Sequence, residues 1–225
     1  MRRFLVLAVL LTACGLPMDR ALDGTRPLDI SICDPATGSF SADITNPYLP
    51  LAPGRAWVLT GGSMRVEIAA LDETEVVAGI ETRVFEEREA KDGELFEISR
   101  NFVAQAADGT VCYFGEDVED YEDGELVGSS GAWRAGIDEA VPGILMPADP
   151  QAGTSYRQEV APGVAEDAAL VLALGGTADL PAGVFTDVLT VMDVDPIGGG
   201  ADGKRYARDV GPLTDGGLRL ESWTG

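Results

Sequence analysis

The chain has 225 residues, 45% of them hydrophobic, and its 38 acidic residues outnumber the 16 basic ones to give a formal net charge of −22. Such a charge repels nucleic acid and anionic lipid headgroups, so we expect no nucleic-acid partner. The sequence contains no histidine, which removes the commonest metal ligand and the commonest general base.

The first residues have the layout of a secretory signal. Two arginines precede an apolar run at residues 4–11, which is too short to span a bilayer as a helix. The sequence Leu11-Thr12-Ala13-Cys14 resembles a bacterial lipobox, in which small residues precede a cysteine that becomes lipidated. The resemblance implies removal of residues 1–13, a lipid anchor on Cys14, and a location in the bacterial cell envelope outside the cytoplasm. Gly15 favours the outer membrane, and an ordinary cleaved signal peptide is the alternative.

Residues 14–40 contain several prolines and glycines with little periodicity, so we interpret them as the lipidated N-terminus and a tether. A β domain is predicted over residues 41–225. If Cys14 carries lipid, Cys33 and Cys112 remain, an even number that suits a disulfide in an oxidising compartment. Their pairing would close a loop of about 80 residues and stabilise the fold by about 4 kcal/mol in the chain-entropy model. Two free thiols are the alternative.

The central part of the chain is punctuated like an antiparallel meander. Asp92-Gly93, Asp108-Gly109 and Asp123-Gly124 separate apolar or aromatic runs, which is a strong hairpin signal. The predicted strands are residues 56–60, 64–71, 75–77, 81–90, 94–105, 110–121, 125–133, 155–160, 167–174, 184–193, 204–210 and 218–223. The pattern predicts an all-β fold: a single antiparallel meander curved into a barrel or half-barrel, with a β-sandwich as the alternative.

An apolar segment at residues 141–147 is framed by prolines, and we predict a loop that cannot form a ladder throughout. Beside Trp133, such a loop could line the portal of an apolar cavity or plug the end of the sheet. Arg157 and Glu159 share one face of a predicted strand, where they could hold a polar ligand or form an ion pair that fixes the register. The candidate ligand-binding residues are Trp133, Ile144, Met146, Tyr156, Arg157 and Glu159.

The acidic stretch GEDVEDYEDGE, residues 115–125, has seven carboxylates in eleven residues. Carboxylates fall on both faces of the predicted strand, which indicates a solvated hairpin tip, and the EF-hand spacing fails at Tyr121 and Ser130. A Ca²⁺ site is the alternative, and no other cofactor is expected. The candidate ligands are Asp117, Glu119, Asp120 and Asp123.

A glycine-rich stretch at residues 198–204 has the spacing of a phosphate-binding loop. Arg205 stands where that motif needs Ser or Thr, and no helix pattern follows. We therefore predict a hairpin loop at this position.

Most of the chain from Phe40 onward resembles a group of secreted bacterial β proteins and lipoproteins that have no assigned activity. The residues that support the resemblance are 46–54, 112–117, 131–136, 142–148, 156–159 and 204–207. In that group an aromatic residue usually stands at the position of Cys112, which implies that a Cys33–Cys112 pair is a local elaboration. The resemblance implies an extracytoplasmic β fold and no catalytic residue.

Catalytic motifs are lacking in the sequence: it has no G-x-S-x-G, no Ser-x-x-Lys, and no histidine to activate a nucleophile. We therefore expect a non-enzymatic protein, held on a membrane by its N-terminal lipid, that binds or scaffolds. Its partner would be a small apolar or amphipathic ligand or an envelope protein. The alternatives are an envelope hydrolase with paired carboxylates, with or without Ca²⁺, and a purely structural surface module.

Overall fold

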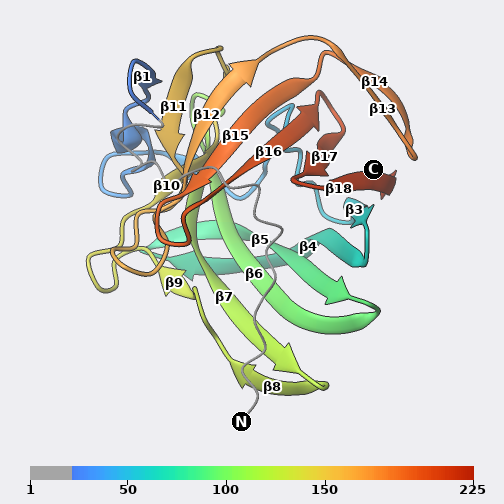
Figure 1. Ribbon diagram of the computed structural model, residues 1–225. Coiled ribbons are helices and arrows are strands. Elements are labelled where there is room, and N and C mark those ends of the chain that lie inside the picture. Colours follow the sequence, from blue (N-terminus) through green and yellow to red (C-terminus); the bar gives the residue numbers. More distant parts are fainter. Residues whose placement is uncertain (1–21) are drawn as a thin grey trace.

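A computed structural model describes residues 22–225, which fold into an all-β protein (Figure 1). The predicted fold class is confirmed: within these residues the one helical element is a 3₁₀ turn, η1 (Ile30–Cys33). No helix in this part of the chain has the length and apolarity needed to cross a membrane. The predicted signal peptide and Cys14 lie outside the described residues.

The described strands are the following, in chain order: β1 Arg26–Pro27, β2 Phe40–Ser41, β3 Ala56–Gly61, β4 Met64–Val77, β5 Ile80–Lys91, β6 Glu94–Ala106, β7 Val111–Glu122, β8 Glu125–Gly128, β9 Trp133–Arg134, β10 Gly143–Met146, β11 Thr154–Arg157, β12 Ala168–Ala173, β13 Thr177–Leu180, β14 Gly183–Thr186, β15 Leu189–Asp195, β16 Gly200–Ala207, β17 Gly211–Asp215 and β18 Leu218–Thr224.

Sixteen strands form one large curved sheet, and β13 and β14 form a separate hairpin. Two antiparallel meanders, β3 to β7 and β15 to β18, are joined because β18 pairs with β3 (Figure 1). Among the described pairs, β1 with β11 is parallel. The sheet is not closed into a barrel. The segments next to β10 and β11, towards the two ends of the strand order, approach each other at an isolated bridge, where the Val141 N–H donates to the Val160 carbonyl at 3.0 Å.

The three predicted Asp-Gly turns are all hairpin turns. Asp92 and Gly93 have φ of 54° and 85°, and Asp123 and Gly124 have φ of 52° and 78°. Left-handed conformations at both central residues match the type I′ turn, which suits the twist of the flanking strands. At Asp108-Gly109 the glycine alone has positive φ, and the Asp108 carboxylate instead accepts from the Thr110 N–H at 2.9 Å.

The loop predicted at residues 141–147 was wrong, because β10 pairs with β7 between the two framing prolines. Gly143 explains how β10 fits: a Cβ there would lie 2.0 Å from the Gln158 carbonyl oxygen. Only glycine lets these backbones pack so closely. The pairing places Ile144 opposite Cys112.

Other strand boundaries differ from the prediction where bulges and turns intervene. Residues 64–71 and 75–77 belong to one strand, β4, whose register with β5 shifts between Ala70 and Thr74. The predicted strand 184–193 is divided between β14 and β15, and the predicted strand 125–133 is interrupted after Gly128.

A disulfide joins Cys33 of η1 to Cys112 of β7, with a Cα–Cα distance of 5.6 Å, which confirms the predicted pairing. Both cysteines are completely buried in the core. The bond attaches the segment that precedes the main meander to β7, and β1 adds a second attachment by pairing with β11. Such a bond is compatible with an extracytoplasmic location.

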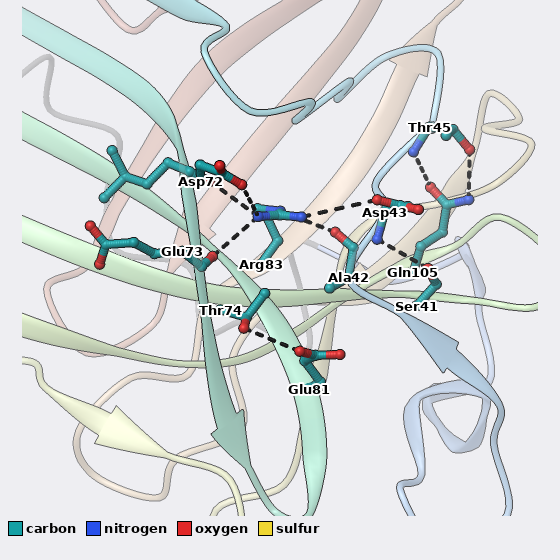
Figure 2. A network of polar contacts seen from close by, with 11 residues as sticks. Ser41, Ala42, Asp43, Thr45, Asp72, Glu73, Thr74, Glu81, Arg83 and Gln105 are labelled. Carbon is teal, nitrogen blue, oxygen red and sulfur yellow. Dashed lines mark hydrogen bonds and ion pairs between the residues drawn. The ribbon is translucent and has the colours of Figure 1, made fainter.

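A second network fixes residues 42–46 against the sheet (Figure 2). The buried Arg83 guanidinium donates to the carbonyls of Ala42 at 3.2 Å, Leu71 at 3.2 Å and Glu73 at 3.3 Å. The Gln105 carbonyl oxygen accepts from the N–H of Thr45 at 2.7 Å. These hydrogen bonds satisfy backbone groups both at the bulge of β4 and in the segment at residues 42–46. They therefore hold that segment against the sheet, and residues 47–51 continue across the sheet from it.

Candidate functional site

A cavity of about 210 Å³ lies between β3–β7, β10, β15–β17 and the segments at residues 49–51 and 158–167. An apolar cavity of about 150 Å³ in another protein is large enough for benzene. This cavity, which is partly open to solvent, therefore has room for a ring of that size with a short substituent.

Part of the cavity wall is apolar and rigid. Trp57 is completely buried, and its indole N–H donates to the Val210 carbonyl at 2.8 Å, which fixes the ring. Residues 47–51, which follow the segment held by the Arg83 network, supply Leu49 and Leu51 to the wall. The apolar lining includes Leu49, Leu51, Trp57, Leu59, Ile68, Phe85 and Leu145.

Charged groups line the rest of the same cavity. Six are carboxyl groups, from Glu87, Glu116, Glu159, Asp167, Asp193 and Asp215, and one is the amine of Lys204. Residues two apart on a strand share a face. Phe85 and Glu87 therefore both face the cavity from β5, and Lys204 and Tyr206 both face it from β16. The site is therefore amphipathic as a consequence of strand periodicity.

Lys204 neutralises two of the six carboxyl groups. Its ammonium lies 3.0 Å from Asp193 and 3.4 Å from Asp215. Burial lowers the pKa of Lys204, but the two carboxylates outweigh burial and raise it well above its usual range. For Asp193, burial raises the pKa, while Lys204 opposes the increase. The Gln158 side chain also lowers the pKa of Asp193, but the buried Oδ1 atom of Asp193 accepts no hydrogen bond of ordinary length.

The other four carboxyl groups have raised pKa values. Burial, and next Glu159, raise the pKa of Glu116 to about 8. Burial raises the pKa of Glu87 to about 7, and burial with the neighbouring Asp167 does the same for Glu159. Burial and Asp195 raise the pKa of Asp167 to about 6. These groups consequently exchange protons near neutral pH.

A neutral polar chain adjoins these acids. The Tyr113 hydroxyl donates to the Asn101 side-chain oxygen Oδ1, and the Asn101 side-chain amide Nδ2 donates to the Ser99 hydroxyl at 3.3 Å. Burial and Glu116 raise the pKa of Tyr113 well above its ordinary value, so its hydroxyl stays protonated. Tyr113 and Asn101 both line the cavity and offer fixed hydrogen-bonding groups.

Of the six predicted ligand-binding residues, Glu159 lines this cavity. Ile144, Met146 and Tyr156 are buried in the core, and Leu145 between the first two faces the cavity instead. Within the described residues Arg157 makes no ion pair with Glu159 or any other carboxylate, so the predicted pair does not form. Trp133 lines a second, more open cavity together with Ile137 and Val164.

The four predicted Ca²⁺ ligands lie on the β7–β8 hairpin and have separate protein partners or face solvent. Asp117 pairs with Arg134 at 2.7 Å, and Glu119 accepts from the Tyr121 hydroxyl at 2.6 Å. Asp120 accepts from the Ser130 N–H at 2.7 Å, and Asp123 occupies the turn. In residues 22–225 no three Asp, Glu or Cys side chains form a group that could hold a metal ion.

Sequence reasoning missed Glu87, Glu116, Asp193 and Lys204. Glu116 belongs to the acidic stretch, but a bulge at Phe114 decides that it faces the cavity together with Tyr113. The sequence did carry a signal for Glu87. It lies two residues after Phe85 on the same predicted strand, so the two side chains were expected to share the face that points to the interior.

The fold and site define a curved all-β protein with an acidic, partly aromatic internal cavity. In comparisons with known proteins, no protein-family model, no curated protein and no solved structure matched the chain.

Proposed function

We propose that the chain is an extracytoplasmic binding protein, anchored to the bacterial cell envelope through Cys14, that holds one small amphipathic molecule in the cavity. The cavity supports the proposal most directly, because apolar and charged side chains together line about 210 Å³ on the concave side of the sheet. A purely structural module would be more stable if that space were filled with apolar side chains, since unfilled volume and buried carboxyl groups both cost free energy.

The binding proposal is tested by native mass spectrometry of the protein purified from its own host. We expect a retained small-molecule mass, and we expect Leu145→Trp to abolish it by filling the cavity that Leu145 lines. Leu126→Trp is the matched control, because Leu126 is 60% exposed on β8. A wild-type protein that carries no bound mass, with both variants folded, would support the structural module instead.

The anchoring proposal rests on the lipobox and is compatible with the disulfide. Metabolic labelling with a fatty-acid probe should mark the wild-type protein and leave Cys14→Ser unlabelled. A wild-type protein without label would contradict the anchor and leave the binding proposal intact.

A carboxylate-based hydrolase is the second candidate, favoured by one observation. Glu116 and Asp167 line the same cavity with raised pKa values of about 8 and about 6, and pairs of carboxyl groups tuned apart in this way serve as acid and base in hydrolases. Turnover of chromogenic glycosides that is lost in Glu116→Gln and kept in Glu122→Gln would support the enzyme. No turnover by the wild-type protein would remove it.

A further inference from the structure

The balance of charge in the cavity favours a positive ligand. Six carboxyl groups face one ammonium, and that ammonium is already paired with Asp193 and Asp215. The carboxyl groups of Glu87, Glu116, Glu159 and Asp167 have no ion pair within residues 22–225. Burial is the main cause of their raised pKa values, and neighbouring carboxyl groups raise them further.

Asp193 provides an independent indication that a hydrogen-bond donor belongs in the site. The residue is 9% exposed and lines the cavity, and its Oδ1 accepts no hydrogen bond of ordinary length, although the Gln158 side chain in the same cavity lies close enough to lower the pKa of Asp193. A buried carboxylate oxygen without a donor is costly, and proteins rarely retain one without a reason. An N–H group of a ligand would satisfy this oxygen without displacing Lys204 from the other one.

Aromatic side chains of the cavity suit the same kind of ligand. Trp57, Phe85, Tyr113 and Tyr206 line the space that the acids share. Aromatic faces attract ammonium groups, and this attraction strengthens when water is excluded. An anion would meet four unpaired carboxyl groups and would gain little from a lysine that is already paired.

On the basis of the proposed function, we infer that the cavity binds a small organic cation: an ammonium group on an aromatic or aliphatic body about the size of benzene. Asp193 accepts a hydrogen bond from the ammonium group, and the carboxyl group of Glu116 in the same cavity adds to the attraction. The apolar wall around Trp57 and Leu59 encloses the body of the ligand.

Isothermal titration calorimetry with three molecules of similar shape tests this inference. The probes are 2-phenylethylammonium, neutral 2-phenylethanol and the anion 3-phenylpropanoate, each titrated at pH 7. We expect the ammonium to bind at least about tenfold more tightly than the alcohol, since hydrogen bonds between charged groups are the stronger ones, and the anion not to bind detectably.

Three variants assign the effect to the cavity. Asp193→Asn should weaken the ammonium about tenfold and leave the alcohol unchanged within about twofold. Glu116→Gln is the second variant, because it breaks no described ion pair, and it should weaken the ammonium in the same direction. Glu122→Gln on the exposed end of β7 makes the same charge change outside the cavity and should bind like the wild type.

Two outcomes would overturn the inference. Alcohol or anion binding as tightly as the ammonium would overturn the assignment of charge while supporting a small-molecule site. Failure of all three shape-matched probes to bind would overturn the inference itself, and the retained mass in native spectrometry would then decide the proposed function separately.

Discussion

Replacing Lys204 by methionine removes the one cation of the cavity and keeps most of the apolar volume of the side chain. The change leaves Asp193 and Asp215 without the ammonium that lies 3.0 and 3.4 Å away. Removing one partner of a buried ion pair costs about 3–5 kcal/mol, because the other charge stays buried. Asp193 is nearly buried, whereas the Asp215 side chain is 46% exposed and contributes little. We therefore expect a loss of about 2–3 kcal/mol in the free energy of unfolding at pH 7.5.

The loss should shrink at lower pH. Without Lys204, the pKa of Asp193 rises further above its unfolded value, so the folded variant takes up a proton that the unfolded chain does not. That uptake stabilises the folded variant as the pH falls, and the difference from wild type should drop below about 1 kcal/mol at pH 5.

Urea denaturation at the two pH values measures both quantities. Lys91→Met is the matched control, because Lys91 is exposed at a hairpin turn and is the only other lysine in the sequence. Its effect should stay within about 0.5 kcal/mol. A Lys204→Met loss that is equal at pH 5 and pH 7.5, or that matches the control, would refute the reasoning.

Three further predictions concern the free energy of unfolding. This free energy should fall as the pH rises from about 5 to about 8, because the cavity acids bind more protons in the folded state than in the unfolded chain. In urea melts across this range, the free energy of unfolding of Glu116→Gln should depend less steeply on pH. A free energy that rises with pH would contradict the prediction. Replacing both Cys33 and Cys112 by serine should cost about 4 kcal/mol for a loop of this length, and a shift in the urea midpoint equivalent to less than about 1 kcal/mol would be inconsistent with it. Gly143→Ala should cost about 2 kcal/mol or more, because the added Cβ forces two backbones apart. Gly203→Ala is the control and should change the urea midpoint little, since its Cβ would meet open space. Equal effects of the two substitutions would contradict the close packing at Gly143.

Local chemistry explains which parts of the fold could be predicted. The turns at Asp92-Gly93 and Asp123-Gly124 were predictable because Asp followed by Gly favours left-handed conformations at both central residues of a turn. The disulfide was predictable because the expected lipidation of Cys14 leaves one pair of the three cysteines. The strand β10 was missed because its pairing with β7 is non-local and its framing prolines lie outside the ladder.

The cavity could not be located from the sequence because register decides which of 38 acidic residues point inward. Strict alternation from Tyr113 would select Gly115 and Asp117, whereas the bulge at Phe114 selects Glu116. Asp193 and Lys204 meet Glu87 only because two distant meanders share one curved sheet. Such long-range placement depends on bulges and on strand order, and neither has a local signature.

Proton exchange on binding is the decisive measurement, because a cation that enters a cavity with partly protonated acids must displace protons from them. Calorimetric titration of 2-phenylethylammonium at pH 7, in two buffers with different ionisation enthalpies, counts those protons. The account predicts proton release, because a bound ammonium lowers the pKa of Glu116, Glu87 and Glu159 and drives them to ionise. Binding accompanied by proton uptake, or by no exchange at all, would contradict it.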